Sequence, residues 1–308
     1  MSEDLAERLV DGLASLGGGH PGARWAHAKG VLCHATFRPT AAAAELSRAD
    51  HFAGPEVRAH VRFSNGSGNP NRHDAARDAR GMSVKFYLSE GTTDLVLLNL
   101  PVYFSRTPED QLAFNAAREL DPETGEPDLA RVGAYLAEHP ETVPAVTAVV
   151  SMAVPSSYAA ETYNSLHAFR FVAGDGTVTH GRYRLSPATT PPAATSDDEE
   201  RSRDFLREEL EERFASGHVR YHVDLTLAGP DDDVNDPAAA WPEDRDVVRL
   251  GDLEITGFAF DRETGDDVLV FDPTRVPDGI ELTDDPILRI RRDAYSISVA
   301  RRTGTSLP

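Results

Sequence analysis

The sequence predicts an α+β fold built on a closed or strongly curled antiparallel sheet, and three observations support this class. Short apolar segments bounded by Gly, Asn or Pro recur along the 308 residues, as strands of an antiparallel sheet do. Helical segments lie before, among and after them without the regular alternation of a parallel sheet. Hydrophobic residues make up 40% of the chain, which is enough for a core and argues against disorder. No repeat or composition shift marks a boundary, so we expect a single domain over 1–308, whose residues 1–19 form a helix and a glycine linker.

Four segments have helical spacing, helix caps or both, namely 3–16, 107–137, 197–214 and about 286–301. The first segment places its leucines on one stripe, and Gly17 begins a glycine run that ends the helix. The second divides into two helices, the first capped by Thr107 with Pro108 in its first turn. The third is strongly charged, which predicts an exposed helix. Asp285 and Pro286 repeat the cap-and-proline pattern at the start of the last helix.

Eight segments have the composition or the alternation of strands, namely 59–64, 82–88, 95–100, 167–172, 182–185, 219–227, 249–260 and 267–271. The clearest is the sixth, in which apolar side chains alternate from Val219 to Leu227 and indicate one buried face. A glycine-rich turn at 174–176 joins the fourth and fifth segments into a hairpin. Polar and acidic composition predicts loops at 186–197 and 231–246.

The charge balance excludes several classes of partner. Lys and Arg number 31 against 51 Asp and Glu, so the net charge is −20 and the chain repels nucleic-acid phosphates and anionic lipids. We therefore expect no nucleic-acid and no membrane partner, although a local basic pocket for a small anion remains open. The one cysteine, Cys33, excludes an internal disulfide and a CxxC zinc site. The N-terminus has neither the positive region nor the apolar run of a signal peptide, which predicts a cytoplasmic protein.

Several basic and aromatic residues stand out against this acidic background. His27 lies directly before an apolar run, and Arg62 lies between apolar strand residues. Each has an ordinary alternative, because an isolated histidine is often structural and an arginine can extend along a strand edge. Arg291 and Tyr295 are four residues apart, so their side chains meet on one helix face. An adjacent cation favours the phenolate form of a tyrosine, although the pair could also be an ordinary surface contact.

Seven stretches together resemble the haem catalase superfamily. They are RWAHAKG at 24–30, VRFSNGSG at 61–68, RDARGMSVKFY at 77–87, TDLVLLNLPVYFSR at 93–106, LHAFRF at 166–171, DPAAAWP at 236–242 and VFDPTRVPDGIELTDDPILRIRRDAY at 270–295. Each is weak alone, but their common order over about residues 20–302 is specific. The resemblance is closer to the small catalase-related peroxidases, since no stretch matches the long N-terminal arm or the flavodoxin-like tail of larger members.

The resemblance implies a catalase-like closed antiparallel β-barrel that encloses haem b, with peripheral helices. Tyr295 matches the tyrosinate that is the proximal iron ligand, an anionic oxygen donor suited to ferric iron. Arg291 matches the arginine that stabilises this phenolate. In the family a histidine and an aspartate hold that arginine, and these match His167 and Asp285, so the four residues would form a proximal relay. Asp285 would then act both in the relay and as a helix cap.

On the distal side the resemblance assigns a catalytic histidine and its partner. His27 matches the histidine that takes a proton from one peroxide oxygen and returns it to the other. Ser64 matches the serine that orients this imidazole. Three arginines match those that bind the haem propionates, namely Arg24, Arg62 and Arg302. Planar guanidinium groups suit carboxylates.

Two departures from the family pattern concern the distal pocket. In full-size catalases an asparagine stands opposite the distal histidine and orients the second hydrogen peroxide, but an ungapped reading puts Leu98 in that position and Asn99 one place later. A one-residue slip turns a strand side chain to the other face, so we expect that Asn99 does not substitute. A phenylalanine of the family aligns with Gln111, where Leu112 or Phe114 could take its place. Both changes suggest a roomier pocket.

The resemblance therefore implies a haem-dependent peroxidase that acts in the oxidative stress response. It would reduce hydrogen peroxide or organic hydroperoxides through a ferryl intermediate, with a small organic electron donor, as a monomer or small homo-oligomer. The alternatives are a true catalase, a hydroperoxide isomerase and a non-catalytic haem-binding protein. Leu98 weighs against the first, and the retained pair of His27 and Ser64 weighs against the last. Nothing in the sequence decides on the isomerase.

Overall fold

The computed structural model describes residues 2–17, 20, 22–121, 123–189, 201–260 and 268–304. Its strands are β1 (Gly30–Pro39), β2 (Val57–Asn65), β3 (Arg80–Leu88), β4 (Gly91–Leu98), β5 (Tyr163–Asn164), β6 (Phe169–Val172), β7 (Val178–Pro187), β8 (Val219–Leu227), β9 (Val247–Phe258) and β10 (Ile280–Leu282). Its α-helices are α1 (Ser2–Gly17), α2 (Ala41–Leu46), α3 (Asp50–Ala53), α4 (Pro108–Ala117), α5 (Leu129–Glu138), α6 (Val143–Ser151), α7 (Phe205–Ser216) and α8 (Pro286–Thr303). Short 3₁₀ turns form at η1 (Pro140–Thr142) and η2 (Tyr158–Ala160).

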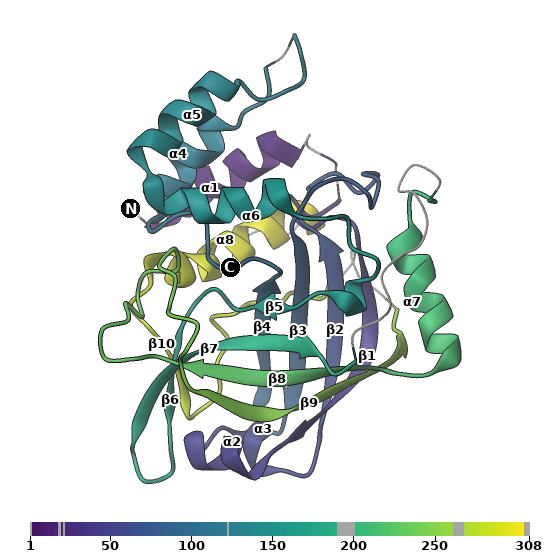
Figure 1. Ribbon diagram of the computed structural model, residues 1–308, viewed down its shortest axis with the longest axis vertical. Coiled ribbons are helices and arrows are strands. Elements are labelled where there is room, and N and C mark those ends of the chain that lie inside the picture. Colours follow the sequence, from purple (N-terminus) through teal and green to yellow (C-terminus); the bar gives the residue numbers. More distant parts are fainter. Residues whose placement is uncertain are drawn as a thin grey trace.

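The strands close into an antiparallel barrel. The hydrogen-bonded order is β7-β5-β4-β3-β2-β1-β9-β8, and β8 pairs again with β7 to complete the ring. The short strands β6 and β10 extend the sheet beside β7. Closure leaves the ring without an open edge, which is how all-antiparallel sheets avoid unpaired backbone groups. The predicted closed or curled antiparallel sheet is therefore confirmed (Figure 1).

The interior of the barrel is filled with side chains. Alternate residues of each strand, such as Val61 and Phe63 on β2, belong to one large buried cluster. Tyr158, from η2, stacks on Phe63 with a centroid distance of 5.5 Å. The backbone carbonyl of Tyr158 accepts hydrogen bonds from the hydroxyls of Tyr163 and Tyr221, at 3.0 and 2.8 Å. These packed and hydrogen-bonded side chains form the core of the barrel.

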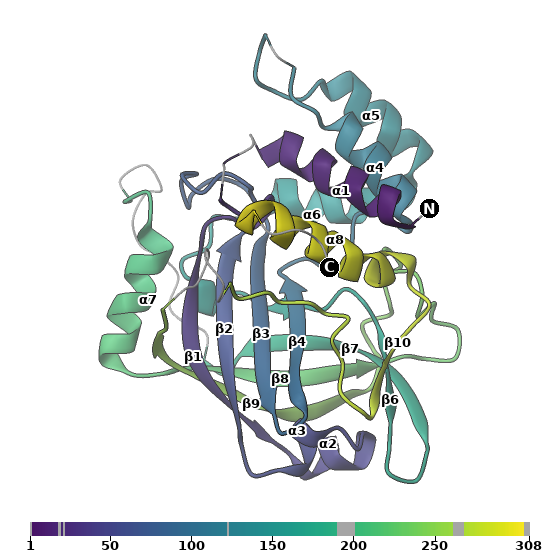
Figure 2. The same cartoon turned by 180° about the vertical axis from the view of Figure 1, so that it is seen from behind.

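A layer of helices covers one end of the barrel. Both views show α1, α4, α5, α6 and α8 gathered together beyond the ends of β2–β4, while α2 and α3 lie at the opposite end (Figure 1, Figure 2). The helix α8 packs on α1 through Ile297, Ala6 and Val10. Arg301 of α8 adds an ion pair of 2.7 Å to Glu7 of α1. No helix among the described residues is long and apolar enough to cross a membrane.

Most predicted elements are present, and the differences have physical causes. The segment 143–151 is rich in β-branched valine, which disfavours a helix locally, yet it forms α6 because packing against its neighbours overrides propensity. The strands β5 and β10 have two and three residues, too few to show a pattern. The predicted helix 197–214 begins only at Phe205, and its residues 197–200 lie outside the described residues.

The prediction of a strand at 267–271 is wrong for its described residues, 268–271, which form no ladder. They are apolar because Leu269 and Phe271 pack on Leu32 of β1. The adjoining segment is held by Asp94 of β4, whose carboxylate accepts the backbone N–H of Asp272 at 2.8 Å. Apolar composition here reflects burial by a covering loop and not strand pairing.

His51 of α3 is a buried histidine that the barrel end encloses. It is 2% exposed, its ring stacks on Phe86 with centroids 5.2 Å apart, and its Nδ1 has no hydrogen-bond partner among the described residues. Burial lowers its pKa from 6.5 to about 3, because the charged form would lose its hydration. The folded state therefore keeps this imidazole neutral where the unfolded chain would protonate it.

We predict that His51→Phe weakens the loss of stability in acid. Since the folded pKa lies below the unfolded one, the wild-type protein loses stability as pH falls from about 6 to 4, by roughly 1.4 kcal/mol per pH unit from this group. The variant lacks this contribution, so its free energy of unfolding should rise relative to that of the wild type as pH falls. Urea unfolding at several pH values measures the slope. A parallel pH dependence in both proteins would contradict the assignment, whatever the difference in absolute stability.

Candidate active site

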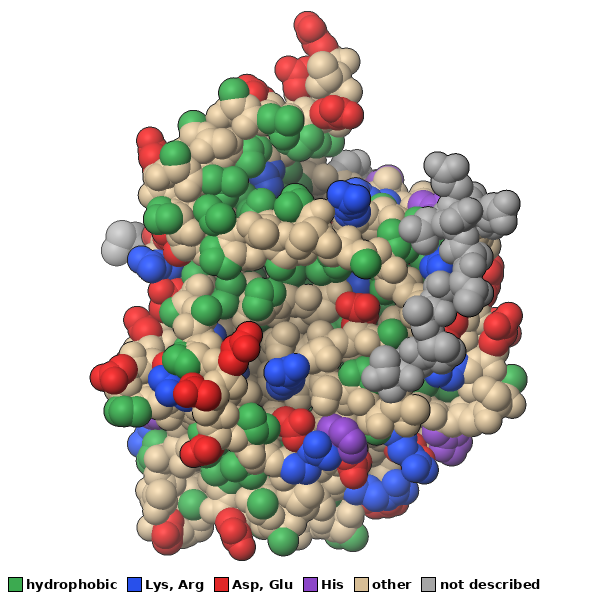
Figure 3. Space-filling model, in the orientation of Figure 1, with side chains coloured by type: hydrophobic (Ala, Val, Ile, Leu, Met, Phe, Trp, Pro, Cys, Tyr) green, Lys and Arg blue, Asp and Glu red, His purple; other side chains and the backbone are tan. Residues whose placement is uncertain are grey.

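A cavity of about 530 Å³ lies between the outer face of the barrel and the helices that cover it. On β2–β4, the residues that point away from the barrel core line it, among them Ser64, Ser83 and Val96. The helices α1, α4 and α8 supply much of the rest of its wall, which is mostly apolar. Figure 3 shows hydrophobic side chains gathered over α4, α5 and α6, next to which the cavity lies. The large site is thus outside the barrel interior and under its helical cover.

His27 enters the cavity from the loop before β1, in a backbone conformation that is rare for a side-chain-bearing residue. Its φ is +57°, in the left-handed region. The surrounding chain holds this conformation, because the His27 N–H donates to the Gly66 carbonyl at 3.0 Å and Arg62 Nη1 donates to the His27 carbonyl at 3.0 Å. A non-glycine residue kept in this region signals a functional demand more often than chance.

His27 and Ser64 form the expected pair, joined by a hydrogen bond of 3.1 Å between Nδ1 and Oγ. Gly81 of β3 leaves the space for it, since a Cβ there would lie 2.8 Å from both atoms. This bond occupies Nδ1, so Nε2 is the ring nitrogen left for a ligand. Sequence reasoning missed Gly81, and the only available signal was a glycine inside an otherwise bulky strand.

The imidazole of His27 is neutral over the physiological range. Burial first, and then the positive charges of Arg62, Arg291 and Arg24, together lower its pKa from 6.5 to about 3. A neutral imidazole can accept a proton, whereas an imidazolium cannot. The electrostatics of the cavity therefore poise His27 as a base.

On α8, Arg291 and Tyr295 meet as their spacing predicts. Arg291 Nη1 donates to Tyr295 Oη at 3.5 Å. Arg291 lowers the pKa of Tyr295, as expected from the sequence, but burial raises it more, so the net shift is upward. The arginine alone therefore does not yield a phenolate at neutral pH. A cation bound at Oη would have to complete the deprotonation.

Asp285 makes both contacts that the sequence suggests. Its Oδ1 accepts the backbone N–H groups of Ile287 and Leu288 at 2.8 and 3.0 Å, capping α8. Its Oδ2 lies 2.6 Å from His167 Nδ1 in a fully buried pair. The same carboxylate thus fixes both the start of α8 and the orientation of the His167 ring.

The link from His167 to Arg291 is indirect in this structure. Among the described residues His167 Nε2 has no hydrogen-bond partner. The ring of Tyr103 lies between the two groups, with its centroid 5.7 Å from that of His167 and 5.6 Å from Arg291 Cζ. Tyr103 therefore contacts both ends of this gap.

The three arginines expected at the cavity edge all line it. They are Arg24, Arg62 and Arg302, which come from the loop before β1, from β2 and from α8. Arg24 Nη2 donates to the Leu269 carbonyl at 3.1 Å, which ties the 268–271 segment to the cavity. Three guanidinium groups converging from separate elements create a local positive region in an acidic protein.

The structure shows where the residues of both departures lie. Leu98 lines the cavity, whereas Asn99 turns away: its Oδ1 accepts the Arg80 N–H at 2.6 Å and its Nδ2 donates to Glu161 at 2.7 Å. The expectation that Asn99 does not replace the missing asparagine thus agrees with its contacts. Gln111 and Phe114 both line the cavity, so Phe114 supplies the aromatic wall beside Gln111.

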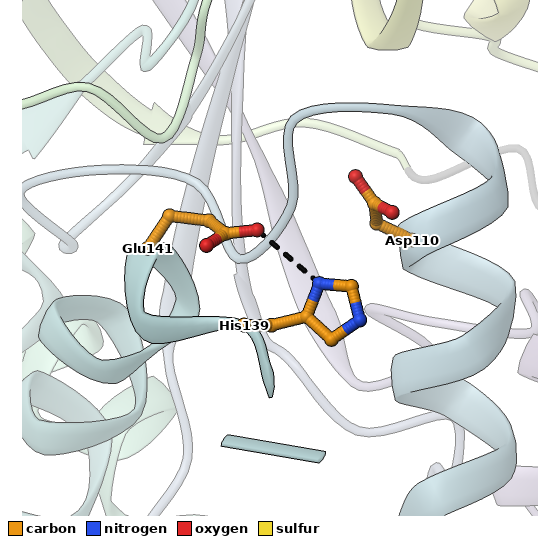
Figure 4. Close-up of side chains that lie close together, drawn as sticks. All are labelled: Asp110, His139 and Glu141. Carbon is orange, nitrogen blue, oxygen red and sulfur yellow. Dashed lines mark hydrogen bonds and ion pairs between the residues drawn. The ribbon is translucent and has the colours of Figure 1, made fainter. Parts of the chain in front are cut away.

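A separate cluster of possible metal ligands lies at the start of α4. Asp110, His139 and Glu141 each offer a ligand atom, all within 4.8 Å of one another (Figure 4). His139 Nδ1 lies 3.2 Å from Glu141 Oε1. None of the three lines the cavity, and both carboxylates sit in first helical turns, where the helix dipole already favours them.

Comparisons of this chain with family models, curated proteins and solved structures all indicate the same family. The Catalase family model matches residues 9–307. A catalase-related peroxidase of Mycolicibacterium paratuberculosis is 41% identical over 97% of this chain and 95% of its own length. One from Synechococcus elongatus is 31% identical over 96% of this chain and 88% of its own. The crystal structure of a fungal catalase superposes with a TM-score of 0.82 at 24% identity, over 96% of this chain and 62% of that one.

We predict that Asp285→Ala costs about 2–4 kcal/mol of unfolding free energy, since it removes a helix cap and leaves a buried histidine unpaired. Asp285→Asn keeps an oxygen for the cap and should lose less. Urea unfolding measures both, and haem retention reports the effect on the cavity. Equal stability of the wild type and Asp285→Ala, with unchanged haem retention, would show that neither contact matters.

Proposed function

The chain belongs to the catalase family, and we propose that it is a haem b-dependent peroxidase that reduces hydrogen peroxide or organic hydroperoxides with a small organic electron donor. One observation carries the proposal: the neutral, oriented His27 and the tyrosine Tyr295 share one cavity. The names of the two similar peroxidases support it. Peroxide removal of this kind would serve the oxidative stress response.

The residues of the cavity fit a haem group. Haem needs a large apolar space, and the cavity has about 530 Å³ and mostly apolar walls. Tyr295 would hold the iron through Oη, and bound iron would supply the positive charge that Arg291 alone does not provide for the phenolate. Arg24, Arg62 and Arg302 would take the propionates through charge-assisted hydrogen bonds.

His27 would move one proton during cleavage of the peroxide. When bound, haem iron would supply the electrons that break the O–O bond. His27 Nε2 would take the proton from one peroxide oxygen and return it to the other, so that water or an alcohol can leave. In this role Ser64 Oγ, which lies 3.1 Å from Nδ1, would accept Nδ1–H and so leave Nε2 unprotonated. Because the pKa of His27 is about 3, this state needs no prior deprotonation.

The contacts of Leu98 and Asn99 favour a peroxidase over a catalase. Dismutation requires a second hydrogen peroxide to be held and oriented, and in the resembled family an amide does this. Here Leu98 fills the corresponding wall and Asn99 is engaged with Arg80 and Glu161. An apolar side chain offers no hydrogen bond to hydrogen peroxide but tolerates the body of a bulkier hydroperoxide or donor.

Stopped-flow absorption of the haem-loaded protein tests this proposal. On mixing with hydrogen peroxide we expect a rapid change of the Soret band that persists until a phenolic donor is added. His27→Ala should keep haem but react about 100- to 10,000-fold more slowly, the usual range for losing a general base. Absence of a Soret band after haem supply would refute the proposal. Oxygen release with an unchanged ferric spectrum would show a catalase instead.

The variant Tyr295→Phe tests separately whether Tyr295 is the iron ligand. Removing the hydroxyl removes the only oxygen that the side chain can offer to iron, so we expect haem occupancy to fall by about tenfold or more. The ratio of Soret to protein absorption and the iron content measure occupancy. Circular dichroism checks that the fold is intact. A fully loaded variant with the wild-type spectrum would mean that another residue is the ligand.

A further inference from the structure

One face of α4 presents a polar group to the otherwise apolar part of the cavity. Gln111, Asn115 and Arg118 are spaced by four and three residues, so they lie along one side of the helix and its C-cap. Gln111 and Arg118 line the cavity. None of the three has a role in the proposed handling of haem or of the proton.

These three side chains are joined through one oxygen. Asn115 Oδ1 accepts from Gln111 Nε2 at 2.9 Å and from Arg118 Nη2 at 2.8 Å. Because Gln111 Nε2 and Arg118 Nη2 both donate to Oδ1, the orientations of the Gln111 and Asn115 side-chain amides are fixed. The arrangement leaves Gln111 Oε1 without a hydrogen-bond partner among the described residues, although Gln111 is only 7% exposed. A buried polar atom with no partner costs free energy unless something else binds it.

Among the described residues Arg118 has no direct ion-pair partner, and the carboxylate of Asp78 acts on its charge only from a distance. Its guanidinium lies 4.1 Å from the centroid of the Phe114 ring, and its Nε donates to the Phe114 carbonyl at 3.4 Å. Among the described residues no carboxylate lies within ion-pair distance of it. The nearby cavity acid Asp78 is engaged by the backbone N–H of Ser67 at 2.6 Å. No hydrogen bond of Arg118 Nη1 is found within the described part of the chain, so this nitrogen can bind an acceptor from the cavity.

The surroundings of this group are apolar. Phe104 and Phe114 lie beside it in the cavity wall, and the valines of α5 and α6 continue that wall, namely Val132, Val146, Val149 and Val150. Val150 is 57% exposed, so the apolar lining extends to the surface. A ligand that satisfies the site therefore has an apolar body and an anionic head.

We infer that Gln111, Asn115 and Arg118 form a binding site for the carboxylate of an amphipathic molecule that enters the cavity. Arg118 would bind the carboxylate oxygens through Nη1 and Nη2, as guanidinium groups do. Gln111 Oε1 would accept an O–H, from a hydroxyl of the ligand or a water carried by its carboxylate. This deepens the proposed function and rests on it for the reaction: the carboxylate belongs to the organic hydroperoxide or to the electron donor.

Calorimetric titration of the full chain, as purified and after haem loading, tests the binding site without relying on activity. The probes are decanoate and decanol, which differ in charge but share an apolar body. We expect the wild type to prefer decanoate, and Arg118→Gln to lose about 10- to 100-fold in decanoate affinity, as for a charged hydrogen bond. Arg118→Lys should recover part of it. Decanol affinity should not change.

Arg131→Gln is the matched control, because Arg131 donates to the Ala117 carbonyl on the neighbouring turn and does not line the cavity. It should bind decanoate like the wild type. Equal wild-type affinity for decanoate and decanol, or undiminished decanoate binding by Arg118→Gln, would overturn the inference. So would an equal loss in the Arg131 control, which would indicate a general effect on the fold.

Kinetics then identify the source of the carboxylate. One arm compares kcat/KM for a fatty acid hydroperoxide and its methyl ester, and the other compares 4-hydroxyphenylpropionate and its methyl ester as donors with hydrogen peroxide. If the wild type prefers the acid in the first arm and Arg118→Gln abolishes this preference, the site belongs to the hydroperoxide. The same result in the second arm assigns the site to the donor. If Arg118→Gln abolishes the preference in neither arm, the inference is overturned for catalysis. Failure of haem loading would refute the proposed function alone, since calorimetry still reports the site.

Discussion

The alternation of side chains along β2, β3 and β4 is the constraint on which the rest of the structure depends. Each strand has one face in the barrel core and one face in the cavity, because successive side chains point to opposite sides. Phe63 and Met82 therefore pack inside while their neighbours Ser64 and Gly81 meet His27 outside. The same register turns Leu98 into the cavity and Asn99 away from it. A shift by one residue would destroy the core and the site together.

Because the strands form both the core and the cavity wall, the barrel positions the side chains that come from loops and helices. His27 sits on an irregular loop with a positive φ, yet its backbone is tied to Gly66 and Arg62, which belong to or follow β2. The helix α8 is fixed at its start by Asp285 and along its length by α1. The distal and proximal groups are thus carried by different elements, and the closed sheet and its helical cover hold them around one space.

Electrostatics within the cavity follow from burial more than from individual charge pairs. For His27, burial and the arginines act in the same direction and keep the imidazole neutral. For Tyr295 they oppose each other, and burial outweighs Arg291. The cavity therefore keeps His27 neutral and able to accept a proton. On the other side, Tyr295 requires a bound cation to become a phenolate. Arg118 extends this pattern, because burial lowers its pKa more than the charge of Asp78 raises it.

The sequence by itself determined the fold class and most elements, and through its resemblance to a known family it supplied the candidate site residues. Local patterns sufficed for the elements, because caps and alternation act within a few residues. The candidate site residues needed the order of seven matching stretches along the chain. Only the tertiary structure decided that the cavity lies outside the barrel, that 268–271 covers β1 without pairing, and that Gln111 and Arg118 face the same space as His27. These facts depend on which surfaces meet, and contacts between residues far apart in the chain leave no periodic signal in any one segment.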